Sequence, residues 1–324
     1  MKRILGIALL GAAWMSAAAG VALAQDWPNR PVRMVVTFPP GGSSDIVARL
    51  ISGPLNERLG QSIVVDNRPG GGGTIGGQIV VTARPDGYTL MLSNTTPISI
   101  SPLMLDKPPY DAVKGFTHAF YIGSVPNVFV LHPSVPAKNM TELVAYLRKP
   151  PKPVNYGSGG IGSIGHIVGE LFKNNTAAKM EHVGYKGSSP MHADLLGGHI
   201  LVAVDSLPQN VPYMQSGKLR GIAVTSPARM KMAPDVPTVV ELGYPKLVAE
   251  NFLGISGPAG LPGPVIDRIH KAMTEVVARS DFVSKLDELG VQGRPMTPAE
   301  FGSFVQKQVV DWGPAVKASG AKLN

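Results

Sequence analysis

The chain has 324 residues, of which 44% are hydrophobic and 16% are charged, and its 38 glycines and 30 prolines lie spread along an apolar background. Disordered chains combine low hydrophobicity with high net charge, so this composition excludes disorder and predicts a turn-rich globular protein of about two domains. The chain contains no cysteine, which excludes disulfides, thiolate zinc sites, cysteine-held iron–sulfur clusters and a cysteine nucleophile.

The first 24 residues have the pattern of a secretory signal peptide. Lys2 and Arg3 form a basic start, an apolar stretch follows, and Ala22-Leu23-Ala24 is an A-x-A cleavage site. A membrane anchor is the competing interpretation, but residues 11–20 are mostly alanine and glycine, and no later stretch has about 18 uninterrupted apolar residues. We therefore predict cleavage after Ala24 and release into the periplasm, without a lipid anchor because no cysteine follows the cleavage site.

The formal net charge is +8, and removal of Lys2 and Arg3 lowers it to +6. The remaining basic excess is scattered, whereas nucleic-acid binding requires a concentrated Lys and Arg patch. We predict no nucleic-acid partner and expect small anions instead.

Short apolar strands alternate with helical stretches along the mature chain. Strands are predicted at 33–38, 62–65, 88–92, 127–131, 154–156, 200–204 and 219–224. Helices are predicted at 46–59, 75–83, 140–148, 164–172, 264–278, 280–289 and 299–317. This alternation is typical of βαβ units and predicts an α/β fold with mostly parallel sheets.

Two of the predicted strands run directly into glycine-rich turns that open a helix. The strand 33–38 leads into residues 39–45 (PPGGSSD), and the strand 154–156 leads into residues 157–163 (GSGGIGS). Such turns place free backbone N–H groups and the positive end of a helix dipole at the carboxyl edge of a sheet, where open α/β folds bind ligands. The end of the strand 88–92, residues 92–96 (LSNTT), offers hydroxyl groups and an amide in the same role. The resulting candidates for ligand binding are Phe38, Gly41, Gly42, Ser43, Ser44, Ser93, Thr95, Ser158, Gly159, Gly160 and Ser163.

Several of these residues also have a purely structural interpretation. Ser43, Ser44 and Asp45 have the residue types that cap a helix, and Asp45 fits this role best because a carboxylate repels an anionic ligand. Phe38 either walls a pocket or belongs to the core. His166 is expected to form a hydrogen bond on a helix surface, and no metal site is predicted because the chain has neither an HExxH nor an HxH motif.

Two segments match the G-x-G-x-x-G pattern of dinucleotide sites, one at residues 157–162 and one at residues 71–76. That fingerprint also requires an acidic residue at the end of the next strand, which neither segment has. The chain has no G-x-S-x-G elbow for a serine nucleophile either. We therefore predict no cofactor and no catalytic residues, and a dinucleotide-binding enzyme is the third interpretation of the chain.

A series of short motifs occurs in order between residues 40 and 238. They are PGGSSD at 40–45, NRPG at 67–70, PDGY at 85–88, HPSVP at 132–136, NYGS at 155–158, YKG at 185–187, DLLGG at 194–198, AVTS at 223–226 and DVPT at 235–238. With these motifs the chain resembles the Bug family, the extracytoplasmic solute receptors of tripartite tricarboxylate transporters. The resemblance implies a type II periplasmic-binding-protein fold, in which two α/β lobes joined by two crossing strands close on a small carboxylate. It places lobe 1 at 25–124 and 227–324, and lobe 2 at 125–226.

The resemblance also implies roles for residues in both lobes. By position, residues 39–45 match the family loop that grips one carboxylate, and residues 158–163 match the loop that takes the other end of the ligand. Lys186 and Asp205 match positions near the cleft. Asp205 either accepts a hydrogen bond from a ligand amine or hydroxyl, or it is solvated and caps the next turn. The chain departs from the common family pattern at Pro39, at Gly184, at 111–116 and at Asn251.

We therefore expect a monomeric periplasmic receptor that captures a small carboxylate, either a di- or tricarboxylate or an aromatic acid. The expected partners are this ligand and integral-membrane transporter subunits. Binding is expected to favour a closed form of the lobes that the membrane partner recognises. The alternative function is a sensor of the same fold that feeds a signalling partner.

Overall fold

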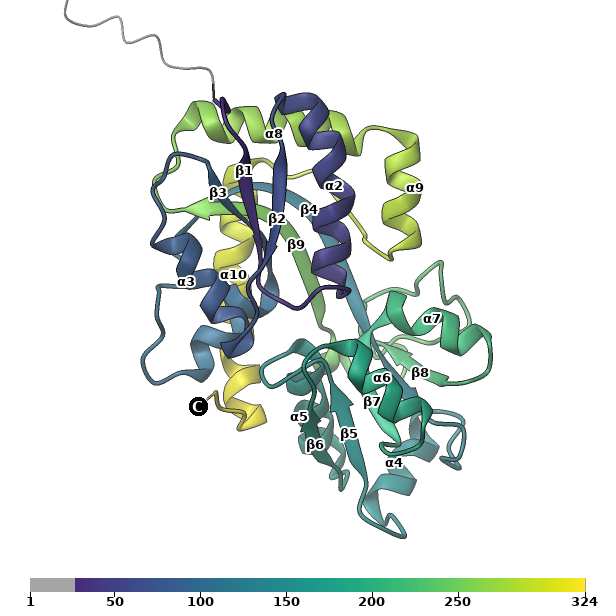
Figure 1. Cartoon of the computed structure of the whole chain (residues 1–324). Helices are drawn as coiled ribbons and strands as arrows, with labels where there is room; N and C mark the ends of the chain where they lie inside the picture. The colour runs from purple at the N-terminus through teal and green to yellow at the C-terminus, as the bar shows by residue number, and fades with distance from the viewer. Residues whose placement is uncertain (1–26, 324) are drawn as a thin grey trace, which may run out of the picture.

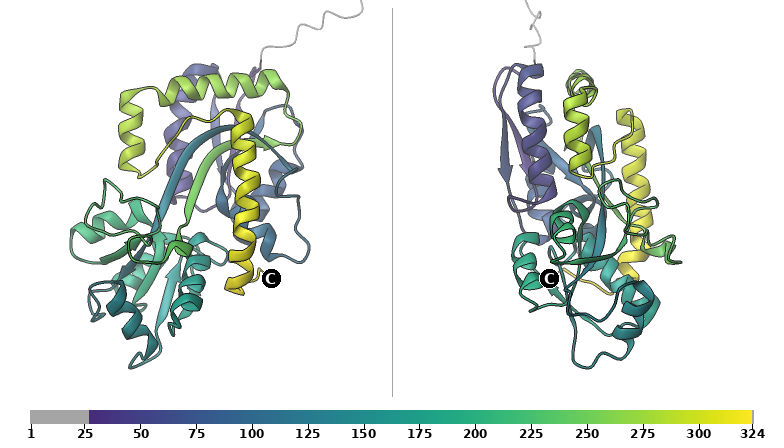
Figure 2. Two further views of the ribbon diagram at one scale, coloured as in Figure 1. Left: turned by 180° about the vertical axis from the view of Figure 1, so that it is seen from behind. Right: turned by 90° about the vertical axis from the view of Figure 1, so that its right-hand side faces the viewer.

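A computed structural model describes residues 27–323 of the chain. These residues form two lobes, and long strands run from one lobe into the other (Figure 1). Figure 2 shows that the last helix runs along the back of the molecule from the upper lobe toward the lower one. The predicted signal peptide lies outside residues 27–323, and no helix within that range is long and apolar enough to cross a membrane.

The first lobe is built on strands in the order β2-β1-β3-β9-β4. Their bounds are β1 Val32–Val36, β2 Ile63–Asn67, β3 Thr89–Asn94, β4 Phe116–Leu131 and β9 Glu250–Pro258. β1 pairs in parallel with β2 and β3, while β9 runs antiparallel to β3 and β4. The carboxyl ends of β1 and β3 therefore open at the same edge of this sheet.

Helices cover both faces of the first-lobe sheet. They are α2 Ser43–Leu59, α3 Thr74–Val81, α8 Gly263–Val277, α9 Ser280–Glu288 and α10 Pro298–Ser319. Val32, Met34 and Val36 of β1 pack in one apolar cluster with α2 and α8, whereas Val35 packs with α3 and α10. Because alternate residues of a strand point to opposite faces, this continuous apolar run requires a sheet that is covered on both sides.

The second lobe has a smaller sheet in which β4 is shared with the first lobe. Its other strands are β5 Asn155–Ser158, β6 Glu181–Gly184, β7 Val202–Ser206 and β8 Arg220–Val224. β5 pairs in parallel with β6 and β7, and β4 runs antiparallel to β7 and β8. The helices are α4 Met140–Arg148, α5 Ile164–Thr176, α6 Ser188–Leu196 and α7 Leu207–Gln215. The apolar side chains of α4 and α5 join one core cluster, and those of α6 and α7 join another.

Strand β4 is 16 residues long and belongs to both lobes. Its residues 116–126 pair with β9, and its residues 127–131 pair with β7 and β8. β4 and β9 are therefore the two crossing strands that the family resemblance implied. α10 forms a third link, since its Phe301 packs in the core of the first lobe and its Trp312 in that of the second.

Residues 227–249 pack on the second lobe, although the expected boundary after residue 226 assigned them to the first. The N–H of Val224 donates to Pro237 O (2.9 Å) and that of Val239 to Val224 O (2.9 Å), so this segment returns to the edge of β8. Val239 and Leu247 then join an apolar cluster of the second lobe. The chain crosses back to the first lobe only at β9, because burying these side chains requires the second-lobe core.

Candidate ligand-binding cleft

A cavity of about 290 Å³ lies between the lobes, at the carboxyl ends of β1, β3, β5 and β7. Nine of the thirteen candidate residues line it: Phe38, Gly41, Gly42, Ser43, Ser44, Gly159, Ser163, Lys186 and Asp205. The four that do not line it are Ser93, Thr95, Ser158 and Gly160. The lining also includes polar residues that were not candidates, namely Asn94, Thr96, Asn127, Ser188, Ser189, Ser206, Gln209 and Asn251.

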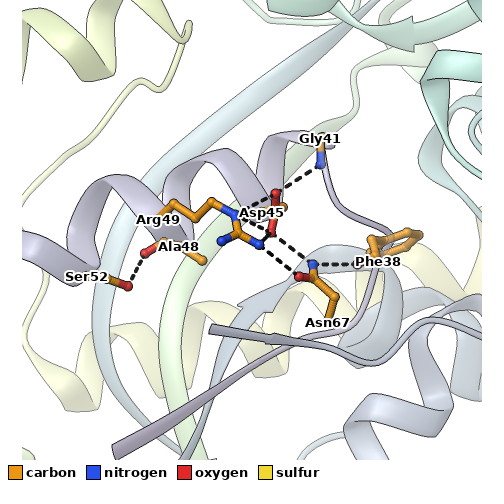
Figure 3. A network of polar contacts seen from close by, with 7 residues as sticks. All are labelled: Phe38, Gly41, Asp45, Ala48, Arg49, Ser52 and Asn67. Carbon is orange, nitrogen blue, oxygen red and sulfur yellow. Dashed lines mark hydrogen bonds and ion pairs between the residues drawn. The ribbon is translucent and has the colours of Figure 1, made fainter. Parts of the chain in front are cut away.

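Asp45 holds the first-lobe loop, residues 38–45, from behind (Figure 3). It is 4% exposed and accepts hydrogen bonds from Gly41 N (3.0 Å), Asn67 Nδ2 (3.0 Å) and Arg49 Nε (3.1 Å). Burial raises the pKa of Asp45, but the hydrogen bonds that it accepts, foremost the one from Arg49, outweigh burial and hold the pKa below its ordinary value. The carboxylate therefore supports the loop as an ion and does not line the cleft.

This support changes which atoms of the loop are free to meet a ligand. Gly41 was a candidate donor, but its N–H is used by Asp45, and its carbonyl accepts from Gln209 Nε2 of the second lobe at 3.0 Å. The loops of the two lobes thus touch directly across the cleft. Phe38 is half-buried and lines the cavity, which favours the wall over the core interpretation.

At the end of β3 the cavity is lined by Asn94 and Thr96 and not by the candidates Ser93 and Thr95. Asn94 lines the cavity and donates from Nδ2 to Ser44 Oγ at 3.3 Å. Ser93 and Thr95 point the other way: Ser93 Oγ accepts from Ser256 Oγ at 2.9 Å, and Thr95 Oγ1 accepts a backbone N–H of β9, also at 2.9 Å. Neither side chain lines the cavity, and for Ser93 the reason is that neighbouring residues of a strand face opposite sides.

In the second-lobe loop the serine hydroxyls bind each other. Ser158 is fully buried, and Ser163 donates its hydroxyl proton to Ser158 Oγ at 3.0 Å. Ser163 Oγ also accepts the N–H of His166 at 3.3 Å and so caps α5. Gly160 N–H points to Ser158 Oγ at 3.3 Å, which turns it away from the cleft. The hydroxyl donors expected to reach a ligand are therefore used within the loop, and His166, expected on a surface, is 7% exposed.

The opposite wall carries a buried carboxylate and an unsatisfied hydroxyl. Asp205 is 6% exposed and accepts from Ser188 Oγ at 2.8 Å and from Asn210 Nδ2 at 3.2 Å. A solvated capping role for Asp205 is thereby excluded. Ser206 Oγ is buried at the cleft without a hydrogen-bond partner among residues 27–323. Lys186 lies exposed at the rim, and it and Asp205 are the charged side chains among the lining residues that the structure describes.

Three helices begin at the cavity, and their first-turn N–H groups face no acceptor within residues 27–323. The residues concerned all line the cavity: Ser43 and Ser44 of α2, Ile164 and Gly165 of α5, and Ser188 and Ser189 of α6. The first N–H groups of a helix cannot bond within the helix, and they carry the positive end of its dipole. Three such ends around one small cavity provide neutral N–H donors that can bind the anionic groups of a ligand.

A family model described as "Tripartite tricarboxylate transporter family receptor" matches residues 47–321. The chain belongs to this family. Protein BugT of Bordetella pertussis is 33% identical over 324 residues, which cover 100% of this chain and 99% of BugT. The Bug-family resemblance of the sequence motifs is thus confirmed.

Two solved structures extend the comparison to the fold. An R. palustris protein solved with adipate is 32% identical, with a TM-score of 0.86 over 92% of this chain and 99% of that one. The periplasmic binding protein BugD is 31% identical, with a TM-score of 0.82 over 91% of this chain and 99% of that one. The two-lobed binding-protein fold is confirmed, and the family and its solved members are receptors and binding proteins, which disfavours the dinucleotide-enzyme interpretation.

Proposed function

We propose that the protein is a periplasmic receptor that captures a small dicarboxylate between its lobes and presents it to the integral-membrane subunits of a tripartite transporter. The observation that carries this proposal is the convergence of the N-termini of α2, α5 and α6 on one cavity. Membership of the receptor family supports it, as does the adipate in the R. palustris relative. No catalysis is part of the proposal.

Both ends of a dicarboxylate find donors in the cleft. One carboxylate would lie against Ser43 and Ser44 of the first lobe, and the other against the first turns of α5 and α6 in the second lobe. A cavity of about 290 Å³ is at the small end of the range for ligand sites, which favours a short acid over a larger aromatic or tricarboxylic one. Asp205 would accept a hydroxyl or ammonium proton of the ligand, since the bonds from Ser188 and Asn210 leave lone pairs of its carboxylate free.

Binding would act through the two lobes. A ligand that bridges donors of both lobes binds the closed form better than the open one, and it shifts the equilibrium by that difference in affinity. The crossing strands β4 and β9 would absorb the movement as a hinge. The closed form of a monomer would then be what the membrane subunits recognise.

The proposed location rests on the sequence and on the relatives. Residues 1–24 carry the features of a signal peptide with cleavage after Ala24. BugD is described as a periplasmic binding protein, which agrees with export of this chain. N-terminal sequencing of the protein purified from a periplasmic extract should start at Gln25.

A ligand screen tests the function. The mature protein is unfolded and refolded to remove any captured ligand, and its melting temperature is measured with adipate, succinate, malate, citrate, benzoate, amino acids and NAD. Ligands that bind only the folded state raise the melting temperature. We expect the largest increase with a C4 to C6 dicarboxylate; an increase with NAD alone would overturn the receptor proposal.

A variant pair tests the cleft itself. Ser206→Ala removes a buried hydroxyl that has no partner in the described chain, so the ligand-free stability should change little, while a ligand that bonds this hydroxyl should bind up to about tenfold more weakly. Ser216→Ala, directly after α7, is the control: its exposed hydroxyl donates to Pro212 O at 2.8 Å, away from the cleft, so the ligand affinity should be unchanged. Equal ligand affinity of both variants and the wild type would remove Ser206 from the site.

A further inference from the structure

The second-lobe loop contacts a stacked pair of histidines. The proposed ligand binding gives these two histidines no role. His166 on α5 and His182 on β6 face each other with ring centroids 3.8 Å apart and an angle of 14° between the ring planes. Neither ring lines the cleft. Each ring, however, contacts the loop of residues 158–163 through a ring nitrogen.

His166 accepts a backbone hydrogen bond from this loop. The N–H of Gly162 donates to His166 Nδ1 at 3.1 Å. A ring nitrogen that accepts carries no proton, so the neutral ring has its proton on Nε2. Protonation of Nδ1, or its removal by mutation, would leave the N–H of Gly162 without its acceptor.

His182 contacts the loop through Ser158. Ser158 Oγ accepts the hydroxyl proton of Ser163 at 3.0 Å and the N–H of Gly160 at 3.3 Å, which fills both of its lone pairs. Its own proton has two acceptors within reach, His182 Nε2 at 2.8 Å and Gly160 O at 3.1 Å, and the ring nitrogen is the nearer one. A proton on His182 Nε2 would present Ser158 with a third donor for two lone pairs, and one loop contact would be lost.

We propose that His166 and His182 are positioning residues, which as a neutral stacked pair hold residues 158–163 in the conformation that turns Gly159 and the start of α5 toward the ligand. This inference deepens the proposed function, because it assigns the residues that shape one end of that site. The ring nitrogens bind the loop on the side that faces away from the ligand. The N–H donors on the ligand side thereby keep no acceptor within residues 27–323.

The charged neighbours of the pair do not oppose its neutral state. The groups that face it are Tyr156 on β5 and Glu170 and Lys173 on α5. Glu170 would favour an imidazolium, but it accepts from Tyr156 Oη at 2.7 Å and from Lys173 Nζ at 3.1 Å. Burial is the main cause that lowers the pKa of both rings, that of His182 to about 3.

The first arm of the test needs no ligand. Amide hydrogen exchange of Gly160 and Gly162 is measured by NMR in the refolded mature protein and in His166→Leu and His182→Leu. We expect the Gly162 amide to exchange at least tenfold faster in His166→Leu, and the Gly160 amide to exchange faster in His182→Leu. Exchange rates equal to those of the wild type in both variants would overturn the proposal.

The second arm measures adipate affinity by calorimetry with variants that restore the acceptor. The amide oxygen of His166→Asn replaces Nδ1 and that of His182→Gln replaces Nε2, while leucine replaces neither. We expect about tenfold weaker binding in each leucine variant and recovery to within about threefold in the amide variants. The matched control is His199→Gln, an exposed histidine of the same lobe, with unchanged affinity.

The two arms separate this inference from the proposed function. Amide variants that bind no better than the leucine variants would reduce the pair to packing and overturn the positioning role. If the wild type binds no acid of the screen, the proposed function fails, and the exchange rates of Gly160 and Gly162 still decide whether the histidines position the loop. Melting temperatures show that each variant is folded.

Discussion

The two loops of the cleft present backbone donors in the same way but are held by opposite chemistry. The first-lobe loop, residues 38–45, is clamped by a charged cluster in which Asp45 binds Arg49 and Asn67. The second-lobe loop, residues 158–163, is supported by neutral groups, a buried serine and two imidazole rings. An anion site therefore does not require a cationic side chain, provided that the donors are oriented by the surrounding structure.

The difference also shows where charge is tolerated near an anionic ligand. The Asp45 carboxylate lies close behind the first loop, but its oxygens are already taken by donors, and Arg49 balances its charge. In the second loop no such pair is present among the described residues in contact with Ser158 or Gly162. The stability of the first loop should thus fall when a charge is removed. The stability of the second loop should fall when a hydrogen-bond acceptor is removed or when an added side-chain atom has no room.

The largest effect is expected from Gly165→Ala compared with Gly42→Ala. A Cβ at Gly165 would overlap the carbonyl oxygen of Val204, whereas a Cβ at Gly42 would meet Pro39 O at an ordinary 3.7 Å. We expect Gly165→Ala to lower the free energy of unfolding by roughly 3 kcal/mol through overpacking. Gly42→Ala should change it by no more than about 0.5 kcal/mol. Urea denaturation measures both, and equal stabilities would contradict the close approach in the second lobe.

Asp45→Asn should break the clamp of the first loop. The amide keeps the size of the side chain but cannot accept all the hydrogen bonds from Gly41, Asn67 and Arg49, and hydrogen bonds to a charged group contribute about 1.5–3 kcal/mol each. We expect a loss of about 2 kcal/mol in the free energy of unfolding. Asp311→Asn, which breaks an exposed ion pair on α10, is the control and should cost no more than about 0.5 kcal/mol. A loss in Asp45→Asn no larger than in the control would refute the clamp.

Acid should weaken the second loop before the first. Burial lowers the pKa of His182 to about 3, below its value of about 6.5 in an unfolded chain, so the unfolded state binds more protons between these pH values and stability falls as the pH drops through them. The pKa of Asp45 lies below its unfolded value of about 3.9, so its contribution is complete above that pH and is lost only below it. The free energy of unfolding is measured from pH 7 to pH 4. The double variant His166→Asn, His182→Gln should lose less stability over this range than the wild type, and an equal loss would contradict the neutral-pair model.

The smallest effect is expected from the direct contact between the lobes. Gln209→Ala removes the hydrogen bond to Gly41 O across the cleft, a partly solvated contact of neutral groups. We expect adipate affinity to fall by no more than about threefold, because the ligand itself supplies the main bridge between the lobes. Gln215→Ala, at the exposed end of the same helix, is the control for calorimetry. A loss above about tenfold would show that Gln209 contacts the ligand directly.

Most of the regular structure could be predicted from local patterns. All seven predicted strands overlap strands of the structure, as the apolar run at 33–38 does with β1. The pattern missed most of β4 and all of β6 and β9. In β9 a Cβ at Gly254 would collide with the ring of Phe301, so this glycine is required by a helix far along the chain and not by a turn. Glycine inside a strand hides the periodicity on which the prediction depends.

The candidate site was only partly predictable for a similar reason. The glycine turns before α2 and α5 carry a local signal, and most of their residues line the cavity. The start of α6 lacks a glycine-rich turn of that kind, so Ser188 and Ser189 were missed. Asn94 lies at a strand end that was recognised, and the alternation of side chains along β3 is the signal that could have identified it.

The sequence by itself determined the alternation of strands and helices, the glycine turns that free backbone donors, and the family to which the chain belongs, because each depends on residues close together in the chain. Only the tertiary structure decided which donors reach the cleft. Ser158 is turned inward because His182, 24 residues further along the chain, offers a ring nitrogen for its proton. A hydroxyl has one proton and two lone pairs, so its direction is set by whichever partners surround it in space.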